Sequence, residues 1–163
     1  MSDAFALGDM IVRSGVTLSA AAPMRRYALR ARDPALLATV IGCALPAKIG
    51  ETVAGIARLG PDEYHARLPV DTILVDGAGQ SVSIVDVSAR AFGIVLEGAR
   101  ATEVLSAGCP LDLAGWPIGR TSRTIFETVE IIVAREAETR WHVEVWRSFA
   151  PWLWAAFSAA AAD

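Results

Sequence analysis

The sequence is poor in the residues and motifs that usually carry chemistry. Its 163 residues include only two cysteines, two histidines and one lysine, Lys48. There is no CxxC and no cluster of Cys and His, so neither a zinc site nor a haem attachment is supported. There is no GxxxxGK[ST], which excludes phosphate transfer by that route. Gly77-Ala78-Gly79 lacks the spacing and the helix start of a GxGxxG turn, which argues against a dinucleotide site.

Basic clusters, targeting signals and long apolar runs are also scarce. The net charge is -3, and the only local concentration of basic residues is Arg25, Arg26, Arg30 and Arg32. This argues against nucleic acid as the main partner. The first 22 residues contain Asp3 and Asp9 without a basic start, unlike a signal peptide. The run 149–162 is shorter than the ~20 residues that cross a bilayer. We therefore expect a cytoplasmic chain without a membrane partner, with Cys43 and Cys109 as buried thiols.

What the sequence does have is apolar residues, at 53% of the chain. This is enough for a substantial core with apolar surface left over, which favours a subunit of a larger assembly. The length fits one domain or two small half-domains that share a core. Nearly all the basic residues are arginines, which suits planar pairing with carboxylates at interfaces, although genome composition can produce the same bias.

The stretch 141–154 has the clearest pattern in the chain. Its first half alternates, which predicts a strand with Trp141, Val143 and Val145 on one face and His142, Glu144 and Trp146 on the other. A helix is expected next, with Ser148 as N-cap and Pro151 in the first turn. Its predicted apolar stripe consists of Phe149, Trp152, Leu153, Ala156 and Phe157. Trp154 falls off that stripe and is therefore predicted to be exposed.

Two copies of one element order are indicated upstream and downstream of residue 90. In the first copy we predict a strand from Arg26, a helix with Asp33 as N-cap, Pro34 at its first position and Gly42 at its end, strands at 52–59, 64–68 and 82–87, and a short helix after Pro69. In the second copy we predict a strand at 92–96 and a helix over 98–107 with Ala101, Val104 and Leu105 inward. Tyr27–Ala31 aligns with Phe92–Leu96, and Tyr64–Leu68 aligns with Trp141–Val145.

This order predicts an α+β fold of two tandem ferredoxin-like halves, each a split β-α-β unit. The expected domains are an N-terminal tail at 1–24 and a main domain at 25–163. Half 1 is about 25–88 and half 2 about 91–163. No sustained period is visible in residues 1–23, so the tail is expected to lie on the domain or on a partner.

Few side chains suggest chemistry of their own. His65 and His142 occupy equivalent strand positions in the two copies, which allows a paired acid/base or metal site. We favour polar-face strand residues instead, because no carboxylate cluster lies at ligand spacing beside them. Ser88 has no GxSxG around it, so Asp86 and Ser88 are interpreted as turn or cap residues. No catalytic, cofactor-binding or metal-binding residue is predicted on this chain.

An interface is the remaining candidate site. Four tryptophans lie close in sequence to arginines in the last third of the chain. One interpretation is core aromatics with solvated guanidiniums; the other is a set of Arg and Trp anchors on a subunit interface. The predicted anchors are Arg120, Arg123, Trp146, Arg147, Trp152 and Trp154, with Trp154 as the best member.

Several runs resemble the gamma subunit of heterotetrameric sarcosine oxidase. They are Leu105-Ser106-Ala107-Gly108-Cys109-Pro110-Leu111-Asp112-Leu113, Arg123-Thr124-Ile125, and Glu144-Val145-Trp146-Arg147-Ser148-Phe149-Ala150-Pro151-Trp152-Leu153-Trp154. Val85-Asp86-Val87-Ser88 followed by Arg90 also fits the pattern. The similarity covers roughly residue 25 to the C-terminus and is absent before it.

The resemblance implies a small accessory chain of a four-chain flavoenzyme, with a fold similar to the folate-binding domain of aminomethyltransferases. Such enzymes oxidatively demethylate sarcosine to glycine, pass the one-carbon unit to tetrahydrofolate as 5,10-methylenetetrahydrofolate and form hydrogen peroxide. The implied partners are the alpha, beta and delta subunits, most directly alpha, and FAD, FMN and NAD are expected on alpha and beta. Two alternatives stay open. One is the equivalent subunit of a complex acting on N-methylglutamate or N-methylproline; the other is a stand-alone folate-binding module.

Overall fold

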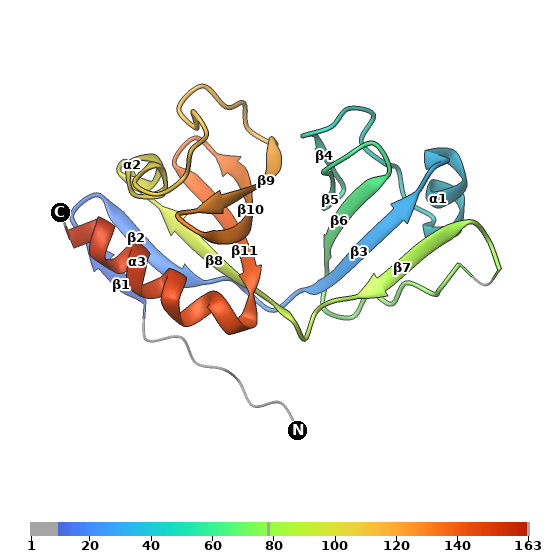
Figure 1. The fold of residues 1–163 in the computed structure, drawn as a ribbon, viewed down its shortest axis with the longest axis horizontal. Helices are drawn as coiled ribbons and strands as arrows, with labels where there is room; N and C mark the ends of the chain where they lie inside the picture. Colours follow the sequence, from blue (N-terminus) through green and yellow to red (C-terminus); the bar gives the residue numbers. More distant parts are fainter. Residues whose placement is uncertain (1–9, 78, 163) are drawn as a thin grey trace. The chain divides into compact units, whose positions relative to one another are not determined.

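The computed structural model describes residues 10–77 and 79–162. These residues divide into two compact units. Unit 1 comprises the described residues up to 22 together with 92–118 and 123–162, and unit 2 comprises 23–91 and 119–122. Each unit is described separately below. The arrangement of the elements along the chain can be followed by colour in Figure 1.

Unit 2 is built on a five-stranded sheet in the order β4-β5-β6-β3-β7. Its strands are β3 (Arg25–Ala31), β4 (Thr52–Val53), β5 (Ile56–Arg58), β6 (Glu63–Leu68) and β7 (Val82–Asp86). Neighbouring strands pair antiparallel. One face of the sheet packs with helix α1 (Pro34–Ile41) around a small core. The core residues are Tyr27, Leu29, Ala31, Leu37, Ile56, Tyr64, Ala66 and Leu68.

The helix predicted after Asp33 is confirmed together with both of its caps. The Asp33 carboxylate accepts a hydrogen bond from the Ala35 N–H at 2.9 Å, and Pro34 takes the first helical position. Gly42 ends the helix at φ 68°, in the left-handed region, and its N–H donates to the Ala38 carbonyl. Glycine suits this position because it has no Cβ to clash there.

Two other predictions for this unit are wrong. The strand predicted at 52–59 is a short hairpin, because Ala54 and Gly55 both take positive φ and turn the chain between β4 and β5. The short helix predicted after Pro69 does not form, and residues 69–77 contain no helix. The Tyr27 hydroxyl accepts a hydrogen bond from the Leu74 N–H and donates one to the Thr72 carbonyl. These contacts hold the segment in an irregular conformation with Leu74 against the core.

Asp86 and Ser88 form the turn after β7, as predicted. The Asp86 carboxylate accepts a hydrogen bond from the Ser88 N–H at 2.8 Å and pairs with Arg25 at 2.8 Å. The Ser88 hydroxyl in turn accepts from the Arg26 N–H, which joins the turn to β3. Hydrogen bonds from Ser88, followed by the charge of Arg25, lower the pKa of Asp86 below its ordinary value. The folded state therefore prefers the ionised carboxylate.

This preference gives a testable acid dependence. A lowered folded pKa adds stability above the unfolded pKa of about 4, and that stability is lost as the pH falls through the folded pKa. The Asp86→Asn variant should therefore differ most from the parent near pH 6 and least near pH 3. The difference should stay below about 1 kcal/mol because the ion pair is partly exposed. Urea unfolding at the two pH values measures it; an equal difference at both would contradict the assignment.

Unit 1 contains a six-stranded sheet in the order β1-β2-β8-β11-β10-β9, with two helices. The strands are β1 (Ile11–Arg13), β2 (Val16–Ala20), β8 (Ala91–Glu97), β9 (Thr121–Phe126), β10 (Val129–Ala137) and β11 (Arg140–Trp146). Helix α2 (Ala101–Ser106) buries the three residues predicted to point inward, and α3 (Ala150–Ala162) follows β11 through a 3₁₀ turn, η1 (Arg147–Phe149). Trp141, Val143 and Val145 all lie in the core between sheet and helices, as predicted.

The sequence left residues 1–24 as a tail on the domain or on a partner; of these, the described residues 10–22 are part of unit 1. Residues 11–20 form a β-hairpin that joins the six-stranded sheet, with β2 antiparallel to β8. Val16 and Leu18 are buried in the core of unit 1. The alternation Val16-Thr17-Leu18-Ser19 is a strand pattern, but it is short and set among small residues. Residues 1–9 lie outside the described part of the chain.

Trp141 anchors the core of unit 1. Its side chain is fully buried, and its indole N–H donates to the Thr102 hydroxyl at 2.9 Å. Trp116 packs against it at 5.9 Å between ring centroids, and the Arg135 guanidinium lies 5.4 Å above its ring. Arg135 also donates to the carbonyls of Ala114 and Trp116. These contacts fasten the Gly- and Pro-rich loop at 111–119 onto the sheet.

Both cysteines carry free thiols; Cys109 is buried, as predicted, and Cys43 is half-buried. Within the described residues, the helices are too short or too polar to cross a membrane.

Candidate subunit interface

Three exposed aromatic side chains lie at the end of β11 and directly after it. Trp146, Phe149 and Trp152 are 36%, 47% and 41% exposed. They are spaced three residues apart. Phe149 and Trp152 lie in η1 and the first turn of α3, where side chains three apart share one side. Trp146 is the last residue of β11. We call these three residues the aromatic patch. The exposed Arg147 and Pro151 lie in the same segment.

The prediction that Trp154 is exposed is wrong. Trp154 is only 8% exposed and belongs to the core of unit 1. The buried stripe of α3 is Ala150, Leu153, Trp154, Phe157 and Ala161. It shares Leu153 and Phe157 with the predicted stripe but leaves Phe149 and Trp152 outside. The N-cap predicted at Ser148 is also not seen, because Ser148 lies inside the 3₁₀ turn.

The three predicted anchor arginines lie in three different places along the chain. Arg147 lies within the patch segment and is exposed. Arg123 lies on β9 and faces Glu130 at 3.6 Å. Arg120 is exposed and belongs to unit 2. Trp146, Arg147 and Trp152 are all exposed and lie within seven consecutive residues of unit 1.

His142 and Glu144 form a buried polar pair that the sequence interpretation missed. Both side chains are buried, and His142 Nε2 lies 2.5 Å from Glu144 Oε1. Glu136 lies on the other side of the ring, 3.7 Å from Nδ1. The sequence interpretation expected no carboxylate cluster at ligand spacing beside the histidines and did not foresee this pairing. The signal was present, because residues i and i+2 of a strand share a face. Within the described residues, no group of three His, Cys, Asp or Glu side chains could hold a metal ion.

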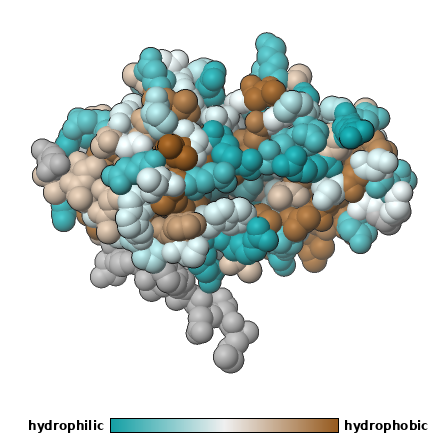
Figure 2. Space-filling model, viewed as in Figure 1, coloured by the Kyte–Doolittle hydropathy of each residue, from teal (hydrophilic) through white to brown (hydrophobic). Residues whose placement is uncertain are grey.

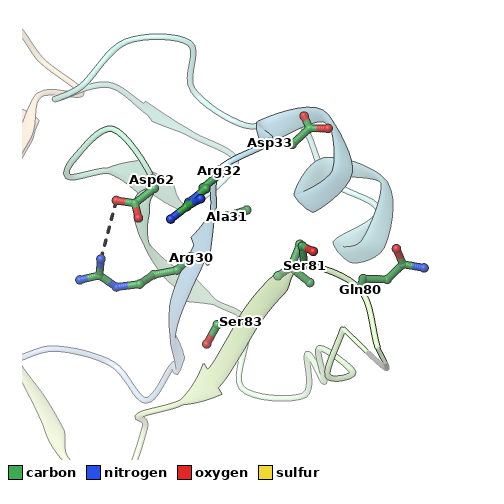
Figure 3. Close-up of a pocket in the computed structure, with 9 residues that line it drawn as sticks. Arg30, Ala31, Arg32, Asp33, Asp62, Gln80, Ser81 and Ser83 are labelled. Carbon is green, nitrogen blue, oxygen red and sulfur yellow. Dashed lines mark ion pairs between the residues drawn. The ribbon is translucent and has the colours of Figure 1, made fainter.

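A surface pocket of about 500 Å³ lies in unit 2, where β3 ends and β7 begins. Figure 3 shows Arg30 and Arg32 on one side of β3, with Ala31 on the other. The Arg30 guanidinium is engaged by Asp62 at 3.7 Å and by Glu63 at 3.5 Å. The other described lining residues are Asp33, Gln80, Ser81, Val82 and Ser83. The described lining thus contains two arginines, two aspartates and two serines, and no histidine, cysteine or lysine.

The fold is of the kind found in the aminomethyltransferase of the glycine cleavage system. The structure is similar to aminomethyltransferase T from Bartonella henselae, with a TM-score of 0.70 over 89% of this chain and 46% of that chain. At 15% identity this likeness establishes the fold alone. The predicted α+β fold, similar to the folate-binding domain of such proteins, is confirmed at this level.

The family follows from closer relatives. The model of the sarcosine oxidase gamma subunit family matches residues 30–163, and the chain belongs to that family. It is 31% identical over 121 residues to sarcosine oxidase subunit gamma from Corynebacterium sp. (strain U-96). That alignment covers 67% of this chain and 59% of the relative's length. A chain of heterotetrameric sarcosine oxidase from Corynebacterium sp. U-96, in complex with pyrrole 2-carboxylate, matches with a TM-score of 0.79 and 30% identity, over 94% of this chain and 89% of that one. The resemblance drawn from the residues is therefore confirmed.

Proposed function

We propose that this chain is a structural subunit of a heterotetrameric, sarcosine oxidase-like flavoenzyme. The observation that carries the proposal is the match over 94% of the chain to a chain of heterotetrameric sarcosine oxidase. In this proposal the partners are alpha, beta and delta subunits in the cytoplasm, with alpha the most direct neighbour. FAD, FMN and NAD are held by alpha and beta. The complex demethylates sarcosine to glycine, transfers the one-carbon unit to tetrahydrofolate and forms hydrogen peroxide.

The aromatic patch is the proposed docking site for the catalytic partner. Trp146, Phe149 and Trp152 are large, exposed and close in sequence, and aromatic residues are enriched at the centres of interfaces. These three residues lie in the run that carries the family resemblance. Because their side chains are exposed, packing of the core does not require large aromatic residues at these positions. Arg147 stands within the patch as a donor for a partner carboxylate. Trp154 belongs to the core of the same unit, and Arg120 and Arg123 are proposed as separate contacts to a partner.

The test is an affinity purification of the tagged chain from its native cells. We expect three co-purifying chains identified by mass, flavin absorbance in the eluate, and hydrogen peroxide formation with an N-methyl amine. Assays with sarcosine, N-methylglutamate and N-methylproline side by side assign the substrate class. A colourless, solitary chain that binds tetrahydrofolate would contradict the proposal and favour the stand-alone folate-binding module.

A further inference from the structure

Two arginines of the local basic cluster in the sequence line the pocket of unit 2. Arg30 lies on β3, and Arg32 directly follows the last residue of that strand. Residues two apart on a strand point to the same face, and Figure 3 shows both side chains on one side of β3. Figure 2 shows hydrophilic surface over the part of unit 2 where β3 leads toward α1, at the upper right. The pocket therefore has two guanidinium groups on one of its sides.

A hydroxyl group lies on the same face of the sheet. Ser83 of β7 is the antiparallel partner of Arg30, and the pairing continues at Ala31 and Val82. Side chains directly opposite each other in such a pair have Cβ atoms about 5 Å apart, and diagonal neighbours about 7–8 Å apart remain within reach of a long side chain. Arg32 is the diagonal neighbour of Ser83. One small anionic group can therefore be contacted by both side chains.

The hydrogen-bonding capacity of the two arginines is unused within the described residues. The Arg30 guanidinium faces Asp62 at 3.7 Å and Glu63 at 3.5 Å, which are ion-pair distances too long for good hydrogen bonds. Arg32 has neither an ion pair nor a hydrogen bond to any described residue. A guanidinium carries several N–H donors and no acceptor, so a ligand here must supply acceptor oxygens.

The acidic residues nearby limit the charge of that ligand. Asp33 also lines the pocket, but its carboxylate caps the start of α1. Asp62, another lining residue, and the adjacent Glu63 both face Arg30. Together they balance the charge of Arg30 and leave that of Arg32 uncompensated. A singly charged anion balances Arg32, whereas a doubly charged phosphate would be repelled by the three carboxylates.

We propose that this pocket binds a carboxylate group, with Arg32 as its bidentate partner and the Ser83 hydroxyl as an additional donor. A guanidinium matches a planar carboxylate through a pair of parallel N–H···O bonds. The volume of about 500 Å³ is in the range of small-molecule sites. The carboxylate belongs either to a free small molecule, such as an amino acid, or to an acidic side chain of a partner subunit. The second source rests on the proposed function; the first does not.

Chemical labelling of arginine in the free chain tests the first source. Phenylglyoxal reacts with accessible guanidinium groups, and mass spectrometry of the digested chain gives the labelling rate of each arginine. Acetate or sarcosine at ten times its half-saturating concentration should slow the labelling of Arg32 about tenfold, because only the unoccupied guanidinium reacts. Arg13, an exposed arginine of unit 1, is the matched control and should keep its rate. Equal or stronger protection of Arg32 by phosphate would overturn the assignment to a carboxylate.

The same labelling of the purified complex, after removal of small molecules, tests the second source. A partner carboxylate should protect Arg32 at least about tenfold without any added ligand. Arg32→Gln should then weaken assembly about tenfold or more, because a charge-assisted contact is lost. Arg32→Lys keeps the charge without the bidentate geometry and should recover only part of that loss. Protection in the complex together with normal assembly by Arg32→Gln would overturn the partner as the source.

The outcomes separate this inference from the proposed function. Absence of protection at Arg32 in both the free chain and an intact, active complex would overturn the inference and leave the proposed function standing. Failure to recover any complex would overturn the proposed function, and the titration of the free chain would still decide the inference. Arg32 is exposed and contributes no ion pair or hydrogen bond within the described residues, so Arg32→Gln should fold with an unchanged melting temperature.

Discussion

Replacing Trp154 with alanine is expected to lower the free energy of unfolding of the chain by about 3–5 kcal/mol, the range seen when large aromatic side chains are removed from cores. Trp154 is 8% exposed and lies on the buried stripe of α3 beside Leu153 and Phe157. Deleting the indole leaves a cavity that the surrounding sheet and helix cannot fill. Denaturant unfolding of the purified chain measures the loss.

The matched variant is Trp152→Ala, two residues earlier on the same helix. Trp152 is 41% exposed, so its removal should cost about 1 kcal/mol or less. If the aromatic patch docks the catalytic partner, Trp152→Ala should instead weaken assembly of the complex by tenfold or more. The two variants therefore test the stability of the chain and the assembly of the complex separately, at positions two residues apart on α3. A large loss of stability with Trp152→Ala, or normal assembly by that variant, would contradict the assignment of the patch.

Helix α3 shows why the sequence could not decide between these two tryptophans. Its residues are almost all apolar, so several stripes fit the helical period equally well. The choice depends on where the helix begins, and the 3₁₀ turn at Arg147–Phe149 changes the phase before Ala150. Periodicity locates a buried face only when polar residues mark the opposite one.

Elements with local chemical signals were predicted well. Asp33, Pro34 and Gly42 fix the limits of α1 by hydrogen bonding and backbone preference, without tertiary contacts. The alternation in β11 likewise identified its core-facing residues. The N-terminal hairpin and the segment after Pro69 were missed because tertiary contacts define them. Pairing with β8 orders the first, and the Tyr27 hydroxyl holds the second.

The sequence correctly predicted which residues of β11 share its second face, but not whether that face is exposed to solvent. Alternation places His142, Glu144 and Trp146 on one face, yet only Trp146 is exposed. Sequence alternation distinguishes the two faces of a strand but does not say whether the polar face meets solvent. Burial of His142 and Glu144 makes their interaction an energetic feature of the fold.

A double-mutant cycle on His142 and Glu144 should reveal strong coupling. Removing one member of a buried, hydrogen-bonded pair costs about 3–5 kcal/mol, because the remaining polar group is left in the protein interior. We expect His142→Ala and Glu144→Ala each to lose a free energy of unfolding in that range. The double variant should lose less than the sum, with a coupling free energy of about 1.5–3 kcal/mol.

The control cycle uses Arg123 and Glu130, an ion pair of unit 1 whose side chains are 37% and 52% exposed. Exposed pairs of this kind couple by less than about 1 kcal/mol, because water screens the charges. Equal coupling in the two cycles, or additive losses at His142 and Glu144, would contradict the structural role of the buried pair. Strong coupling between His142 and Glu144 would show that the buried pair stabilises the fold. A stabilising role would then explain both residues without a catalytic one.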